Sequence, residues 1–221
     1  MDITVGTISI HYTKAGQGHP LLLLHGNGED HTLFDGLVPR LATHFTVYAL
    51  DTRGHGASSS GLLDYRLFAQ DVLGFIAALG LEPVILVGFS DGGITGLIAA
   101  STQSAAVRRL VVAGANLTPL GLRWPVYWAT RVQNWKAPSP LLALMLEQPH
   151  ITRAMLNNIQ APTLVLAGQH DVVRPSDTAR IVKEIPQARG ITVPGASHSS
   201  YIKDGAALYG LLQPFLQPLA I

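Results

Sequence analysis

Ser90 stands in a short pattern that could carry nucleophilic chemistry. The segment Gly88-Phe89-Ser90-Asp91-Gly92 fits G-x-S-x-G, follows an apolar run and precedes a helical pattern. A tight strand-to-helix turn of this kind strains its central residue and lifts that side chain clear of the sheet. The free N–H groups at the start of the helix then face the same spot. The pattern predicts a serine nucleophile; the alternative is a glycine-rich turn with an incidental serine.

A serine hydroxyl needs a base to remove its proton, and the chain offers nine histidines. His198 follows the last predicted strand, in a loop of small residues before the final predicted helix. Such a loop can bring the imidazole over the sheet edge where Ser90 is expected. His25 and His55 lie in glycine loops at the same edge. We expect these two to hold loop geometry through hydrogen bonds, which leaves His198 as the predicted base.

The imidazole in turn needs a carboxylate that fixes its tautomer and stabilises its charge. Asp171 stands just after the penultimate predicted strand and is the predicted acid. Asp177 is the fallback, although it is better placed in the first turn of a helix, and Asn116 offers an amide but no acid. Taken alone, Asp171 is better explained by a loop or capping role. Its combination with Ser90 and His198 favours a catalytic one.

A tetrahedral oxyanion needs about two backbone donors. We expect one to be the N–H of Asp91, directly after the nucleophile. The other is predicted to be the N–H of Asn27, in the "HGNG" loop that follows an apolar strand pattern. A plain glycine turn is the alternative interpretation of this loop.

Apolar strands and helical patterns alternate along the chain and must position these residues. Strands are predicted at 3–5, 8–13, 21–26, 45–50, 83–89, 108–115, 162–168 and 189–195. Helices are predicted at 64–79, 91–101, 176–185 and 204–217, and Asp64 is expected to cap the first of them. A helical pattern over 31–43 is disturbed by Pro39. This order predicts an α/β fold with a mostly parallel eight-stranded sheet flanked by helices.

Residues 1–221 are predicted to form one domain, with residues 117–158 as a short helical cap insertion. This segment is rich in prolines and holds all three tryptophans. Trp124 and Trp128 are four residues apart, so they share a face of a helix. We expect them, together with Asp91, to bind substrate in an apolar pocket over Ser90. The alternative is that the tryptophans attach the cap to the body of the protein.

Composition limits the class of protein further. Apolar residues make up 48% and charged residues 13%, which excludes a disordered chain. A net charge of +1 without a basic run predicts neither a nucleic-acid nor a membrane partner. The absence of cysteine excludes disulfides, thiolate metal sites and a cysteine nucleophile. We expect a cytoplasmic protein without a signal peptide, cofactor or metal, and the sequence leaves its oligomeric state open.

These motifs together resemble the esterase-like branch of the α/β-hydrolase superfamily. The order Ser90, Asp171, His198 matches the family order of nucleophile, acid and histidine. The "HGNG" loop is similar to the family's oxyanion loop, and "DTRGHGAS" at residues 51–58 is similar to its D-x-R-G-x-G-x-S segment.

The resemblance implies a serine hydrolase that cleaves small, mostly apolar carboxylic esters through an acyl-enzyme. Carbon–carbon bond hydrolysis, lactone opening, perhydrolysis and a non-enzymatic ligand-binding signalling role remain open alternatives. "FSDGG" is also similar to the turn of valacyclovirase-like esterases, in which an acidic group is thought to meet an amino group of the substrate. Asp91 is the matching residue, and a solvated helix N-terminal aspartate explains it equally well.

Overall fold

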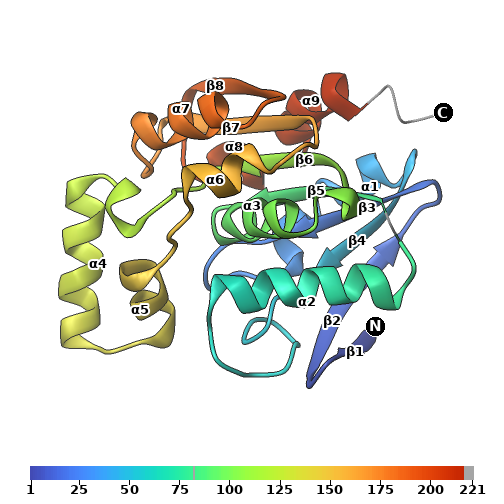
Figure 1. Cartoon of the computed structure of the whole chain (residues 1–221), viewed down its shortest axis with the longest axis horizontal. Helices are drawn as coiled ribbons and strands as arrows, with labels where there is room; N and C mark the ends of the chain where they lie inside the picture. The colour runs from blue at the N-terminus through green and yellow to red at the C-terminus, as the bar shows by residue number, and fades with distance from the viewer. Residues whose placement is uncertain (82, 217–221) are drawn as a thin grey trace.

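Eight strands form one sheet in the computed structural model, which describes residues 1–81 and 83–216. The sheet order is β1-β2-β4-β3-β5-β6-β7-β8 (Figure 1). The strands span Asp2–Val5, Ile8–Ala15, His19–Leu24, Phe45–Leu50, Val84–Phe89, Val107–Ala113, Thr163–His170 and Ala188–Ser197, from β1 to β8. The β1–β2 and β2–β4 pairs are antiparallel and the remaining pairs are parallel, which confirms the predicted sheet.

The helices follow the predicted order in the described part of the chain. The α-helices span Val38–Leu41, Tyr65–Ala78, Asp91–Thr102, Trp124–Lys136, Pro140–Glu147, Arg153–Asn157, Pro175–Glu184, Ser200–Lys203 and Gly205–Leu216, from α1 to α9. Short 3₁₀ turns lie at His31–Phe34 (η1), Ser104–Ala106 (η2) and Pro119–Gly121 (η3). The helical pattern of residues 31–43 splits into η1 and α1, with Pro39 in the first turn of α1, where its missing N–H costs no helical hydrogen bond. Residue 217, the predicted end of the last helix, lies outside the described residues.

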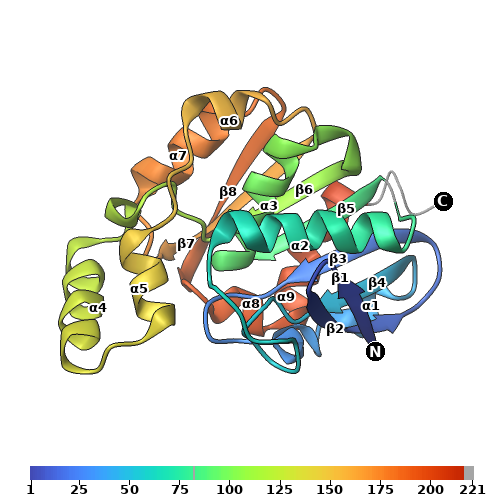
Figure 2. The ribbon, with the colours of Figure 1, turned by 60° about the horizontal axis from the view of Figure 1, so that its bottom comes forward.

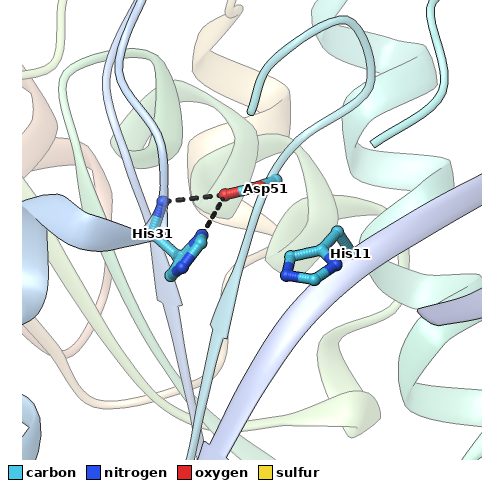
Figure 3. A group of neighbouring side chains, drawn as sticks. All are labelled: His11, His31 and Asp51. Carbon is cyan, nitrogen blue, oxygen red and sulfur yellow. Dashed lines mark hydrogen bonds and ion pairs between the residues drawn. The ribbon is translucent and has the colours of Figure 1, made fainter. Parts of the chain in front are cut away.

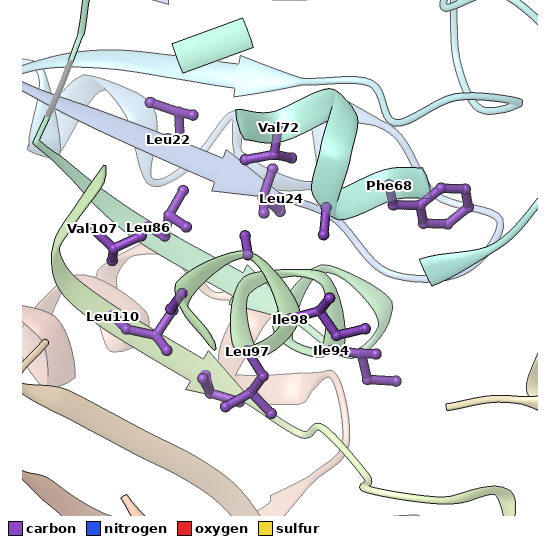
Figure 4. Packing of buried hydrophobic residues seen from close by; sticks show 14 of the residues in the cluster. Leu22, Leu24, Phe68, Val72, Leu86, Ile94, Leu97, Ile98, Val107 and Leu110 are labelled. Atoms are coloured by element: carbon purple, nitrogen blue, oxygen red, sulfur yellow. The ribbon is translucent and has the colours of Figure 1, made fainter. Parts of the chain in front are cut away.

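Helices cover both faces of the sheet, which explains why its central strands are apolar throughout (Figure 2). Along β3, Leu22 and Leu24 belong to a core with α2, α3, α6 and α7 (Figure 4). Leu21 and Leu23 belong to a second core on the opposite face with η1, α1, α8 and α9. Successive side chains of a strand point to opposite faces, so a strand buried on both sides needs an unbroken apolar run.

The segment 117–158 divides between two places in the fold. Helices α4 and α5 lie beside the helix–sheet sandwich rather than on either of its faces (Figures 1 and 2). Helix α6 belongs to the sandwich, because its Leu156 is fully buried in the core that contains α3. No helix in residues 1–81 and 83–216 has both the length and the apolar character needed to cross a membrane.

The turn from β5 into α3 depends on glycines, because three backbone segments meet there without room for a Cβ. A Cβ on Gly92 would overlap the carbonyl oxygen of Leu24, at the end of the neighbouring strand β3. A Cβ on Gly88 would overlap the carbonyl group of Gly92. Both neighbours are backbone atoms, which cannot move aside as a side-chain end does. The glycines therefore allow α3 to start directly against the sheet.

We expect Gly92→Ala to lower the free energy of unfolding by about 1–3 kcal/mol or more, because the new methyl group meets backbone. The matched control is Gly210→Ala in α9, where a Cβ meets no atom within 4 Å. This control should be stabilised by about 0.5–1 kcal/mol, the usual gain from alanine in a helix. Urea unfolding followed by far-UV circular dichroism measures both variants, and a Gly92→Ala variant as stable as Gly210→Ala would contradict this account.

Candidate active site

Ser90 lies at the turn between β5 and α3 in a strained backbone conformation. Its φ is 52° and its ψ is −113°, and it is the only non-glycine residue with positive φ in the described part of the chain. Its N–H donates to the carbonyl of Ala113 at 2.8 Å, and its own carbonyl accepts from the N–H of Ile94 at 3.0 Å. Such a conformation costs on the order of 1–3 kcal/mol and persists only where surrounding contacts enforce it. Here those contacts come from β6 and α3.

His198 connects the Ser90 hydroxyl to a buried carboxylate. His198 Nε2 lies 3.2 Å from Ser90 Oγ, and His198 Nδ1 lies 2.7 Å from Asp171 Oδ1. The three residues come from the turn after β5, the loop after β7 and the turn after β8. Because these parallel strands end at the same edge of the sheet, residues 108 positions apart meet there. The structure thus brings the three predicted residues together in the predicted order.

Asp171 is held as an ionised acceptor. Besides His198, it accepts the N–H of Val173 at 3.0 Å and the N–H of Gly168 at 3.1 Å. Burial alone would raise the pKa of Asp171, but these hydrogen bonds and the His198 imidazole outweigh burial and lower that pKa. The fallback acid, Asp177, lies in the first turn of α7, where it accepts the N–H of Leu117 at 2.8 Å.

Gly114, at the end of β6, makes space for the His198 ring. Its φ is +62°, and a Cβ at this position would lie 2.7 Å from His198 Cε1 and 2.9 Å from Nδ1. On another side the imidazole packs against Phe89, with ring centroids 4.8 Å apart. The ring is therefore confined by packing as well as by its two hydrogen bonds.

The "HGNG" loop lies against Ser90, as the predicted oxyanion site requires. A Cβ on Gly26 would lie 3.2 Å from Ser90 Cβ. Within the described residues, neither the N–H of Asn27 nor that of Asp91 donates to another protein group. These two donors remain the predicted oxyanion hole.

His25 fixes the peptide that carries the Asn27 N–H. His25 Nδ1 lies 2.7 Å from the carbonyl oxygen of Gly26, and the N–H of Thr52 donates to His25 Nε2 at 3.0 Å. The Thr52 donor sets the tautomer, so the proton resides on Nδ1 and is donated to Gly26. Because C=O and N–H point in opposite directions across a trans peptide, holding the Gly26 carbonyl also aims the Asn27 N–H. This is the loop-holding role expected of His25.

A pocket of about 290 Å³ opens beside Ser90. Its walls combine apolar and polar side chains: Asn27, Tyr65, Ser90, Asp91, Asn116, Leu122, Val126, Met145, Gln148, Val172, Val173 and His198. Among the residues that the structure describes, Asp91 is the only carboxylate that lines this pocket, and neither lysine nor arginine lines it.

The Asp91 side chain is buried at this pocket between two donors. Asn27 Nδ2 donates to Asp91 Oδ2 at 2.9 Å, and the Tyr65 hydroxyl forms a second hydrogen bond to the carboxylate. Burial raises the pKa of Asp91, and these hydrogen bonds oppose part of that rise. The solvated aspartate considered in the sequence analysis is therefore wrong for this side chain.

The structure places Trp124 and Trp128 away from the pocket, contrary to the expectation that they line it. They are 51% and 54% exposed on α4, and the guanidinium of Arg174 lies 4.3 Å from the Trp124 ring centroid. The two tryptophans do share a helix face, but it is another residue of α4, Val126, that lines the pocket. Helical spacing predicts which residues share a face and leaves open which way that face points.

Tyr65 and Gln148 are pocket residues that sequence reasoning missed. Gln148, after α5, accepts the Tyr65 N–H at 3.2 Å and donates to Asp64 Oδ2 at 3.0 Å. Asp64 caps α2, as predicted from the sequence, by accepting the N–H groups of Arg66 and Leu67. The capping role of Asp64 could be predicted from the sequence. Its contact with Gln148, which is 84 positions away, could not, because no local pattern indicates it.

Comparison with known proteins agrees with this geometry. A family model described as the alpha/beta hydrolase fold matches residues 19–144. Serine hydrolase BPHL of Mus musculus is 31% identical over 251 residues, covering 97% of this chain and 85% of that protein. N-formylmaleamate deformylase of Pseudomonas putida is 29% identical over 237 residues, covering 89% of this chain and 88% of that protein. The crystal structure of the enol-lactonase from Burkholderia xenovorans LB400 shares the fold, with a TM-score of 0.85, 21% identity and coverage of 98% of this chain and 100% of that chain.

The chain belongs to the α/β-hydrolase family, and it is a hydrolase of that superfamily. The resemblance recognised in the sequence is confirmed at the level of family and fold.

The environment of His25 predicts a measurable dependence of stability on pH. Burial, as the largest cause, lowers the pKa of His25 from 6.5 to about 4, whereas the unfolded chain keeps the ordinary value. The unfolded state therefore binds an extra proton below pH 6.5, and stability falls as the pH drops from 6.5 toward 4. The loss of unfolding free energy caused by His25 is at most about 3 kcal/mol.

Chemical unfolding at a series of pH values tests this dependence. The slope of unfolding free energy against pH should flatten in His25→Asn and stay as in the parent in His44→Asn, which alters an exposed histidine. Equal slopes in all three proteins would contradict the assignment to His25.

Proposed function

We propose that this protein is a serine hydrolase that cleaves small carboxylic esters through an acyl-enzyme. The observation that carries the proposal is the unbroken hydrogen-bond chain from Ser90 through His198 to Asp171, at 3.2 and 2.7 Å. Nucleophile, base and orienting acid are each within the reach that this chemistry needs.

The proposed reaction begins when His198 Nε2 takes the proton of Ser90 Oγ, which attacks the ester carbonyl carbon. The N–H groups of Asn27 and Asp91 stabilise the negative oxygen of the tetrahedral intermediate. His198 then gives its proton to the leaving alcohol, and Ser90 is left acylated. A water, deprotonated by His198, then attacks the acyl carbon. The bond from this carbon to Ser90 Oγ breaks, the carboxylic acid leaves, and His198 returns its proton to Ser90 Oγ. Asp171 stays ionised throughout and stabilises the imidazolium, which suits its lowered pKa.

The pocket supports a small, neutral or positively charged substrate. Its apolar walls come from Leu122, Val126, Met145, Val172 and Val173, and its volume of about 290 Å³ lies near the lower limit for small-molecule sites. Within residues 1–81 and 83–216, no lysine or arginine lines the pocket to balance an anionic substrate group. A buried charge without a partner is costly, so esters of dicarboxylic acids are disfavoured.

A second, narrower candidate is an ester that carries an amino group, and Asp91 is the observation that favours it. In the described part of the chain, Asp91 is the only carboxylate that lines the pocket, and it is adjacent in sequence to the proposed nucleophile. An ammonium group on the substrate would offset the cost of keeping this buried carboxylate charged.

The Ser90→Ala variant is expected to lose turnover of p-nitrophenyl acetate by a factor on the order of 10⁶ if the three residues act as a unit. The control is Ser101→Ala, which alters a serine of α3 whose hydroxyl donates to the Ile98 carbonyl. A fluorophosphonate probe should label the parent protein and Ser101→Ala but not Ser90→Ala. Near-parental turnover by Ser90→Ala would refute the proposed nucleophile, and labelling without turnover would favour a ligand-binding role.

The Asp91→Asn variant is expected to lower kcat/KM for amino-acid esters about 10- to 100-fold. This factor corresponds to the free energy that a hydrogen bond to a charged group usually contributes. It keeps the backbone N–H and the side-chain size, so p-nitrophenyl acetate hydrolysis should change little. Asp35→Asn, at an exposed aspartate, is the matched control. A loss of equal size on neutral and amino-acid esters would count against the amine contact and leave the ester hydrolase itself intact.

A further inference from the structure

A second group of chemically capable side chains lies outside the pocket, at the antiparallel edge of the sheet. His11 lies on β2, His31 begins η1, and Asp51 directly follows β4 (Figure 3). One ligand atom from each, an imidazole nitrogen or a carboxylate oxygen, lies within 4.8 Å of the other two. No local pattern marks this group, because its successive members are 20 residues apart and belong to three different elements.

Backbone pairing fixes these residues in place. The N–H of Asp51 donates to the His11 carbonyl at 2.9 Å, which sets β2 and the end of β4 side by side. The N–H of His31 donates to Asp51 Oδ1 at 2.8 Å, which anchors the start of η1 to the same carboxylate. The cluster therefore rests on the sheet and not on a free loop.

Each imidazole already has a carboxylate on its Nδ1. Asp2 lies opposite His11 in the β1–β2 register, and Asp2 Oδ1 is 2.8 Å from His11 Nδ1. Asp51 Oδ1 is 2.7 Å from His31 Nδ1. Metal-binding histidines in proteins commonly give their other ring nitrogen to a carboxylate, which orients the ring and raises its basicity. With Nδ1 engaged by Asp2, His11 has Nε2 available as a ligand atom.

We propose that His11, His31 and Asp51 bind a divalent transition-metal ion of the Zn²⁺ type, with Asp2 orienting His11. Two imidazoles and one carboxylate are a donor set that suits zinc. The ion takes the place of the proton between His31 Nδ1 and Asp51 Oδ1, and the His31 imidazole then carries its proton on Nε2. His11 Nε2 supplies the third ligand. Zinc ligands lie about 3.3 Å apart in a tetrahedral site, so the His11 ring must approach by up to about 1.5 Å.

The surroundings permit that movement and give the ion a route of entry. The side chains of His11 and His31 are 23% and 21% exposed, whereas the Asp51 carboxylate is fully buried beneath them. The centroids of the two rings are 5.5 Å apart, and their planes are tilted by 47° to each other. Rotation of the partly exposed His11 ring closes the site over a carboxylate that stays fixed, and water completes the coordination shell.

Isothermal titration with ZnCl₂ tests the proposal, in the full chain carrying His198→Ala so that the active-site imidazole does not compete. We expect one zinc site, weakened at least about 10-fold by His11→Ala and about 10- to 100-fold by Asp2→Asn, which removes only the orienting carboxylate. His44→Ala, at an exposed histidine outside the cluster, should bind as the parent does, and MgCl₂ should give no binding.

Parental zinc affinity in His11→Ala, or equal losses in His11→Ala and His44→Ala, would overturn the proposal. Circular dichroism shows whether each variant is folded. Should His31→Ala unfold because Asp51 loses its partner, His11→Ala and Asp2→Asn still decide the outcome, since these two side chains at the sheet edge are 23% and 64% exposed.

Discussion

Close backbone approach at the start of α3 is the constraint on which the rest of the site depends. Gly88 and Gly92 let the helix begin against the ends of β3 and β5, and this tight turn forces Ser90 to positive φ. The same turn directs the serine hydroxyl toward the edge where β7 and β8 end, so that His198 and Asp171 can reach it. The strain at one residue is thus sustained by packing that also builds the core.

A second network holds the loops on the antiparallel side of the nucleophile. Thr52 donates to His25, which in turn holds the Gly26 carbonyl, while neighbouring Asp51 accepts N–H groups from His31 and Ala57. The loops after β3 and β4 therefore share one set of buried hydrogen bonds. Because each donor meets an acceptor, removing one partner would leave a buried polar group unsatisfied, at a cost of about 1–3 kcal/mol.

Much of the fold could be predicted because its signals are local. The unbroken apolar runs of the buried strands, the capping Asp64 and the glycine-flanked Ser90 are each visible within a few residues of sequence. The positions of His198 and Asp171 followed from one further rule, that parallel strands end at a common edge. The walls of the pocket depend instead on how α4 and α5 dock beside the sheet. Trp124 was misplaced for that reason, since no local pattern records the direction in which a docked helix faces. Tyr65, the first residue of α2, was missed because nothing near it in the sequence indicates its contact with Gln148 after α5.

The concentration of all three tryptophans on one peripheral helix has a practical consequence for spectroscopy. Trp124, Trp128 and Trp135 all belong to α4, and the last is 81% exposed. Intrinsic tryptophan fluorescence is consequently expected to report the local environment of α4, where all three indoles are at least half exposed. The described residues of the hydrophobic core around the sheet include no tryptophan, so changes in the core do not alter this fluorescence directly.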